Sequence, residues 1–84
     1  MNQPKLDLTV FFLSISSAAY IGLGLASHDG QEKKVNLPLA RQNIELLELM
    51  QEKTKGNLSA DETKLLQQLL FELRMRYLEV EKTS

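Results

Sequence analysis

SADETKLLQQLLFELRMRYLEV, at residues 59–80, carries the clearest structural signal in this chain of 84 residues. Ser59 and Glu62 form a capping box, in which each side chain can bind the backbone N–H of the other residue. The apolar residues that follow are spaced by three and four positions: Leu66, Leu69, Leu70, Leu73, Tyr77 and Val80. This spacing places them on one helix face, so the pattern predicts a helix over about residues 60–81.

The preceding segment predicts a second helix, over about residues 37–55. Asn36 is a favourable N-cap, and Pro38 is tolerated in the first turn because its missing N–H would be unpaired there anyway. Lys53 suits the negative end of the helix dipole, and Gly56 is the residue expected in left-handed geometry after the helix. Because only a tight connection separates the two helices, we expect them to pack as an antiparallel hairpin.

Residues 8–27 contain no charged side chain, and they allow three interpretations. We favour a core helix over about residues 8–26, with fraying or termination near Gly22 and Gly24. The run is also long enough for a membrane anchor, although its serines and glycines lower its hydropathy. The third interpretation is a signal peptide with a cleavage site near residues 24–26, but the chain begins without a basic cluster.

Length and composition predict one small helical domain over residues 1–84. Residues 1–7 and 82–84 are expected to be frayed tails, and the polar residues 27–36 an exposed loop. The net charge of −1 and the interleaving of basic with acidic residues argue against nucleic-acid binding. Without cysteine, no disulfide can stabilise so short a chain, and a partner chain is a natural source of stability.

No set of residues suited to catalysis is evident. His28 is the single histidine, and beside Asp29 it is interpreted as a solvated loop residue rather than a metal ligand. Glu45, Glu48 and Glu52 share a helix face, but no Glu-x-x-His helix completes a carboxylate metal site. We therefore predict no catalytic, cofactor-binding or metal-binding residue, no cofactor and no enzymatic activity.

The two later helices carry more apolar surface than a small monomer needs. The residues expected to form a self-association or partner surface are Phe71, Met75, Leu78, Leu46, Leu49 and Met50. Since a surface helix needs an apolar stripe only a little over 100° wide, we predict a helical homodimer. A different protein or a lipid on this surface is the alternative.

Several motifs resemble an uncharacterised bacterial family, domain of unknown function 1844. They are the helix start Asn36-Leu37-Pro38-Leu39-Ala40-Arg41, the turn Lys53-Thr54-Lys55-Gly56-Asn57-Leu58 and the segment Leu69–Tyr77. The resemblance covers nearly the whole chain and implies a short, helical, cytoplasmic bacterial protein with no assigned activity. The chain departs from the family pattern in two places: the loop after the first helix has no proline, and Tyr20-Ile21 stand where a histidine is typical.

Three arginines complete the set of candidate residues. Arg41, Arg74 and Arg76 are expected to meet in the hairpin, where one of them pairs with a carboxylate across a dimer seam or all remain in solvent. The favoured function is a non-catalytic structural or interaction protein that self-associates and can bind an unidentified protein. The alternative is a small protein associated with the inner membrane and anchored by residues 8–27.

Overall fold

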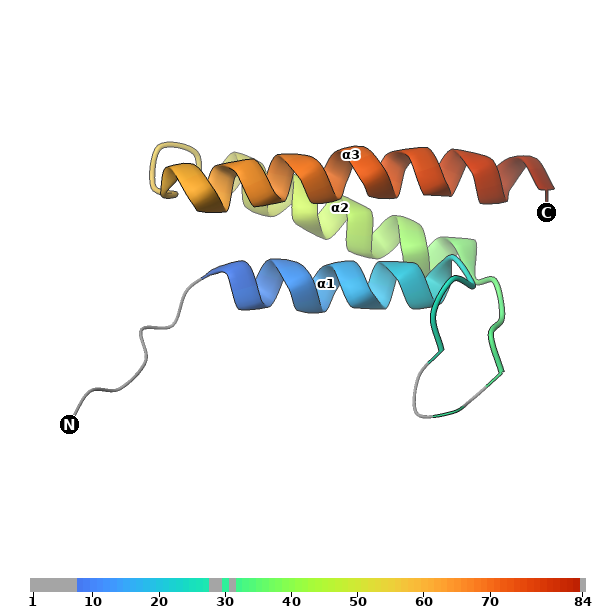
Figure 1. Ribbon diagram of the computed structural model, residues 1–84. Helices are drawn as coiled ribbons and strands as arrows, with labels where there is room; N and C mark the ends of the chain where they lie inside the picture. The colour runs from blue at the N-terminus through green and yellow to red at the C-terminus, as the bar shows by residue number, and fades with distance from the viewer. Residues whose placement is uncertain (1–7, 28–29, 31, 84) are drawn as a thin grey trace.

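The computed structural model describes residues 8–27, 30 and 32–83, and every regular element in this part of the chain is an α-helix. The helices are α1 (Leu8–Gly22), α2 (Leu37–Lys53) and α3 (Ala60–Thr83). Figure 1 shows α1 and α3 lying one above the other while α2 crosses behind them. Each helix contacts both of the others. The predicted all-α class with three helices is confirmed.

The capping box begins α3 as the sequence predicts. The Glu62 N–H donates to Ser59 Oγ at 3.1 Å, and the Ser59 N–H donates to Glu62 Oε1 at 2.9 Å. The helix continues to Thr83, two residues beyond the predicted end. The Thr83 hydroxyl donates to the Val80 carbonyl at 3.1 Å, which helps to satisfy the last turn.

The start of α2 also follows the prediction, because Asn36 Oδ1 accepts the Leu39 N–H at 3.2 Å. The helix ends at Lys53, two residues earlier than predicted. Thr54 ends it, since both its N–H and its hydroxyl bond to the Met50 carbonyl. Gly56 has the expected left-handed backbone, with φ of +85°.

Helix α1 ends at Gly22, four residues before the predicted boundary at residue 26. The Gly24 N–H bonds to the Ile21 carbonyl and the Leu25 N–H to the Tyr20 carbonyl, both at 3.0 Å. With φ of +75° at Gly24, this is a Schellman motif, which a glycine adopts without a Cβ penalty. Termination near the two glycines is thereby confirmed, and the longer helix is corrected.

Gly22 is also a point where the backbones of α1 and α2 approach each other closely. A Cβ at this position would lie 2.6 Å from the Ala40 backbone nitrogen and 3.0 Å from its Cα. The Asn36 N–H donates to the Gly22 carbonyl at 2.7 Å, which ties the start of α2 to the end of α1. The absence of a side chain at Gly22 therefore sets the distance between these helices.

The hydrophobic core lies between the three helices. Its buried members are Phe12, Ala19, Leu23, Ala40, Ile44, Leu47, Leu66, Leu70 and Leu73. Helix α1 adds the small buried side chain of Ser16. The described residues of the predicted loop are exposed between Ser27 and Asn36. The interpretation of the uncharged segment as a core helix agrees with this burial.

A bilayer span takes about 20 residues, whereas α1 has 15. Within the described ranges, no helix has the length and apolar character that crossing a membrane requires.

Candidate interaction surfaces

Three large hydrophobic side chains are exposed in a row on the outer side of α3. Phe71, Met75 and Leu78 are 66, 49 and 55% exposed. Their i, i+4, i+7 spacing puts them on one face, which points away from the buried Leu70 and Leu73. We call Phe71, Met75 and Leu78 the α3 ridge. The sequence singled out these three residues, and the structure places all of them in solvent.

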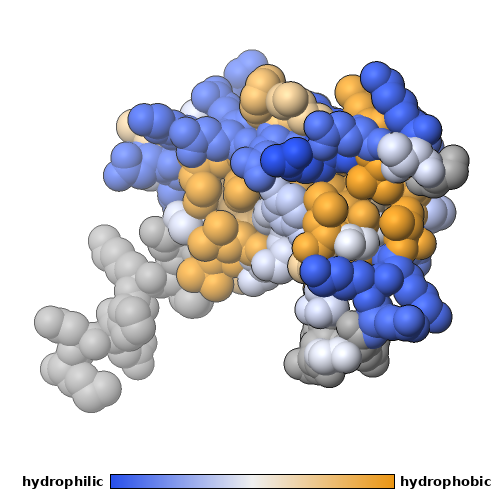
Figure 2. Space-filling view, turned by 45° about the vertical axis from the view of Figure 1, so that its right-hand side comes forward, coloured by the Kyte–Doolittle hydropathy of each residue, from blue (hydrophilic) through white to orange (hydrophobic). Residues whose placement is uncertain are grey.

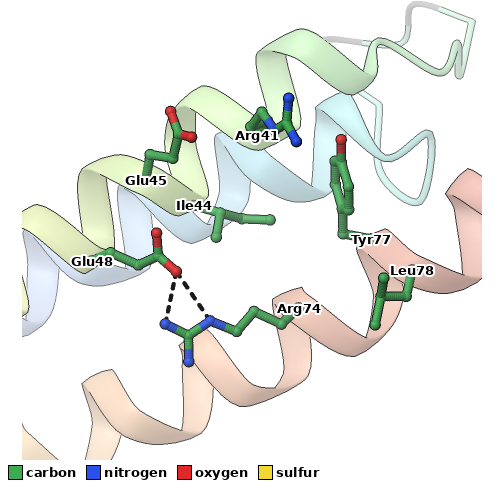
Figure 3. A pocket seen from close by; sticks show the side chains of 7 residues that line it. All are labelled: Arg41, Ile44, Glu45, Glu48, Arg74, Tyr77 and Leu78. Atoms are coloured by element: carbon green, nitrogen blue, oxygen red, sulfur yellow. Dashed lines mark hydrogen bonds and ion pairs between the residues drawn. The ribbon is translucent and has the colours of Figure 1, made fainter.

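A groove of about 330 Å³ runs beside the ridge, between α2 and α3 (Figure 3). Its lining residues are Arg41, Ile44, Glu45, Glu48, Arg74, Tyr77 and Leu78. Ile44 is buried and Tyr77 half-buried, so the groove is apolar in its depth and charged at its rim. Because Leu78 belongs to both features, the groove and the α3 ridge form one continuous surface.

An ion pair crosses this groove. Nε and Nη2 of Arg74 donate to Oε2 of Glu48 at 3.1 and 2.7 Å (Figure 3). Both side chains are about half exposed, so the pair contributes only about 0.2–1 kcal/mol. Arg74 thus finds a carboxylate within its own chain.

The other two arginines lie on different helices, Arg41 on α2 and Arg76 on α3. Arg41 lines the same groove as Arg74, and within the described residues it has no hydrogen bond or ion pair. Arg76 donates to Glu79 at 3.0 Å and lines a second hollow, beside Phe71 and Met75. The structure therefore brings two of the three arginines together and separates the third.

The α2 residues of the predicted surface are divided between solvent and core. Leu46 and Leu49 are exposed, as expected. Met50 is only partly exposed and packs against the core. Its position three residues after the buried Leu47 explains this, because residues three apart share a helix face. Met50 is therefore a core neighbour more than a contact residue.

Sequence reasoning missed the outward side of α1. Val10, Phe11 and Leu13 are 62, 52 and 47% exposed on a helix without any charged residue. Figure 2 shows a hydrophilic band along α3 and hydrophobic surface below it, on the side where α1 lies. The sequence does contain a signal for this exposed side, because the helix has no charged residue on any side. A helix that packs on the core of a monomer with one side in water carries a polar face on that side.

We call the residues that point away from the core the α1 outer face. They are Val10, Leu13, Ser14, Ser17, Ala18 and Ile21. The two serines are exposed at its centre, and Ala18 and Ile21 are half-buried near its C-terminal end. The face is uncharged throughout, which distinguishes it from the α3 ridge and its groove.

Two polar contacts hold α1 against α3. The Leu8 N–H at the start of α1 donates to Glu62 Oε2 at 3.2 Å, so the capping carboxylate of α3 also serves α1. The Tyr20 hydroxyl donates to Glu72 Oε1 at 2.6 Å. Burial, followed by this bond to Glu72, raises the pKa of Tyr20 to about 12. The tyrosine hydroxyl thus acts as a structural donor between the helices.

In the described residues, the carboxylates do not assemble into a metal site. The described ranges contain no group of three His, Cys, Asp or Glu side chains close enough to hold a metal ion. Of the acidic face on α2, Glu48 is engaged by Arg74. His28 and Asp29 lie outside the described residues.

A comparison with protein families agrees with the resemblance found in the motifs. The family model described as "Domain of unknown function (DUF1844)" matches residues 5–79. No curated protein and no solved structure matches the chain.

Proposed function

Since the chain belongs to the DUF1844 family, whose description names no activity, we propose that it is a non-catalytic interaction protein that forms a homodimer and offers a second surface to another protein. The observation that carries the proposal is the exposure of large hydrophobic side chains on two separate faces. One is the α3 ridge with its groove, and the other is the α1 outer face. A monomer rarely exposes extensive apolar surface unless that surface makes contacts.

The size of the core supports this proposal. Six large side chains are fully buried, in a molecule with principal extents of 46 × 28 × 16 Å. Ten large hydrophobic side chains are exposed in the described part of the chain. A domain of this length buries a smaller share of its surface on folding than a larger domain does, so additional burial in a dimer adds stability that the single chain lacks.

In the proposal, α2 and α3 form an antiparallel hairpin that presents the α3 ridge. The Glu48–Arg74 ion pair and the shared lining of the groove support this arrangement. The mixture of an apolar depth with Arg41 and Glu45 at the rim suits a protein partner, because protein interfaces combine an apolar centre with a polar rim. The absence of cysteine supports a reducing bacterial cytoplasm as the location.

The experiment is thermal unfolding followed by circular dichroism over a wide range of protein concentration. If the folded unit is a dimer, mass action raises the melting temperature as concentration increases. A melting temperature that is independent of concentration contradicts the homodimer. The ridge variant Phe71→Glu, which changes an exposed residue outside the core, tests whether this dependence needs the α3 ridge.

A further inference from the structure

Two hydrogen-bond donors without partners lie at one end of the groove between α2 and α3. The Arg41 guanidinium and the Tyr77 hydroxyl make no hydrogen bond or ion pair within the described residues. Figure 3 shows Arg41 directed toward Tyr77 and away from Glu45, the acidic residue one turn further along α2. Arg41 and Tyr77 also line a second hollow of about 250 Å³ at the start of α2, so they border both hollows. This end of the groove therefore offers several N–H groups and one O–H group to a ligand.

The rest of the groove differs from this end. At the opposite end the charges are already paired, because Arg74 donates to Glu48 at 2.7 Å. Glu48 follows Arg41 by seven positions, which is about 10 Å along a helix. Between the two ends the surface is apolar: Ile44 is 7% exposed in the depth, and Leu78 is 55% exposed at the edge. The groove thus combines free donors at one end with an apolar middle.

A single carboxylate matches these donors. A planar guanidinium can donate two parallel hydrogen bonds to a carboxylate, and a tyrosine hydroxyl can donate a third. A doubly charged phosphate fits less well, because one guanidinium offsets only one charge and the Glu45 carboxylate lies on the same rim. Since apolar surface begins beside the donors, the ligand that suits the groove carries apolar groups next to its carboxylate.

The shape of the groove suits a protein segment more than a small molecule. Sites for small molecules enclose most of the ligand surface, whereas this groove continues past Arg41 into the second hollow and past Leu78 onto the α3 ridge. A helix that lies in a groove uses side chains up to seven positions apart, which covers the distance from Arg41 to Glu48. Figure 3 shows α1 behind the groove, so a bound segment would cover the side of α2 and α3 that α1 leaves open.

From these observations we propose that the groove binds an amphipathic segment of another protein through an Asp or Glu carboxylate of that segment. Arg41 and Tyr77 bind the carboxylate, and neighbouring apolar side chains of the segment cover Ile44 and Leu78. This inference rests on the proposed interaction function and names the chemistry of the partner. It does not require the homodimer.

The first test uses a small probe that joins a carboxylate to one apolar side chain. N-acetyl-leucine has both groups, and N-acetyl-leucinamide has nearly the same shape without the charge. In an NMR titration of the native chain, we expect N-acetyl-leucine to shift the amide signals around Arg41 and Tyr77, and N-acetyl-leucinamide to shift them far less. Equal shifts with the two probes, or no shift with either, overturn the carboxylate site.

Variants of the chain assign the binding to the two donors. Arg41→Gln removes the charge at an exposed position, and Tyr77→Phe removes only the hydroxyl. We expect N-acetyl-leucine to bind about tenfold more weakly to Arg41→Gln and about two- to tenfold more weakly to Tyr77→Phe. Glu45→Gln should bind it more tightly, because a like charge leaves the rim. The matched control Arg76→Gln removes the same charge from an exposed position outside the groove and should bind as the native chain does. Equal losses in Arg41→Gln and Arg76→Gln overturn the site, because they report the net charge alone.

The second test distinguishes a protein segment from a small carboxylic acid. The probe is a helical peptide of about 16 residues with both ends blocked, a central glutamate, and leucines three and four positions to either side. Because more apolar surface is buried, the peptide should bind at least about tenfold more tightly than N-acetyl-leucine, and its glutamine analogue should bind more weakly than the peptide itself. If N-acetyl-leucine binds as tightly as the peptide, the groove is a site for small acids and the partner segment is overturned.

Light scattering on the same chains separates this inference from the proposed homodimer. If Arg41→Gln converts a native dimer to a monomer, a second copy occupies the groove and the inference is overturned. If the native chain is a dimer and neither probe binds, the inference fails and the homodimer stands. If the native chain is a monomer, the homodimer fails, and the titrations decide the inference independently.

Discussion

Replacing Gly22 by alanine is expected to destabilise the fold, even though alanine is the better helix former. The new Cβ would lie 2.6 Å from the Ala40 nitrogen, 3.0 Å from its Cα and 3.1 Å from its Cβ. Ordinary contacts of this kind are about 3.5–4.0 Å long. Since the nearest atoms belong to the backbone, no side chain can rotate away, and α1 must move away from α2.

The size of the effect follows from two opposing contributions. Alanine gains up to about 1 kcal/mol of helix propensity over glycine. Overpacking costs about 1–3 kcal/mol, and the upper part of this range applies where backbone meets backbone. The movement also strains the bond from the Asn36 N–H to the Gly22 carbonyl. We therefore expect a net loss of about 1–2 kcal/mol in the free energy of unfolding.

Urea and thermal unfolding, followed by circular dichroism, measure this loss. For a domain of this size, 1 kcal/mol corresponds to about 4–8 °C in melting temperature, so the variant should melt about 4–16 °C lower. Native chain and variant must be compared at one concentration, because dimerisation makes the melting temperature depend on it. The control Gln42→Ala, at an exposed position of α2, should change the stability by less than about 0.5 kcal/mol. A Gly22→Ala chain as stable as the native one refutes the reasoning that this glycine sets the helix spacing.

The remaining predictions concern the polar contacts. The pKa of Tyr20 is raised from 10.0 to about 12, so the neutral hydroxyl stabilises the fold fully below pH 10, and this stabilisation is lost between about pH 10 and 12. In Tyr20→Phe the free energy of unfolding should therefore fall less over this pH range than in the native chain. Parallel curves of unfolding free energy against pH for the two chains contradict this prediction. Ser59→Ala should lower the free energy of unfolding by about 1 kcal/mol. Glu62→Ala should lower it further, because the Glu62 carboxylate caps α3 and also accepts the Leu8 N–H at the start of α1. Equal losses of the two variants in urea unfolding argue against this second role of Glu62. A double-mutant cycle of Arg74→Ala and Glu48→Ala should give a coupling of about 0.2–1 kcal/mol without changing the oligomer mass, and dissociation of the dimer by Arg74→Ala alone contradicts the pairing within the chain.

Local sequence signals predicted the helices well. The capping residues Asn36 and Ser59 start α2 and α3 as expected, because a side-chain oxygen there pairs a backbone N–H that the helix leaves free. The C-terminal end of α1 was predicted less accurately. The glycines at positions 22 and 24 indicate that the helix ends there, whereas the apolar residues beyond them indicate that it continues. Leu23 is buried although it follows the helix, so its hydrophobic character did not indicate a continued helix.

The contacts between helices were less accessible from the sequence. The exposed row at Phe71, Met75 and Leu78 could be identified from the sequence. The spacing of these residues places them on the helix face opposite the main apolar stripe, where polar side chains are expected. The partners of the arginines could not, since they depend on how α2 and α3 are rotated against each other. The exposed side of α1 could not be predicted for a related reason. An uncharged helix predicts burial, and only the structure shows that one side of this helix is exposed.

Sedimentation equilibrium of the native chain tests the proposed self-association most directly. We expect a single species whose mass is close to twice the chain mass of 9.6 kDa, dissociating only on strong dilution. A species that keeps the mass of one chain at the highest attainable concentration contradicts the account.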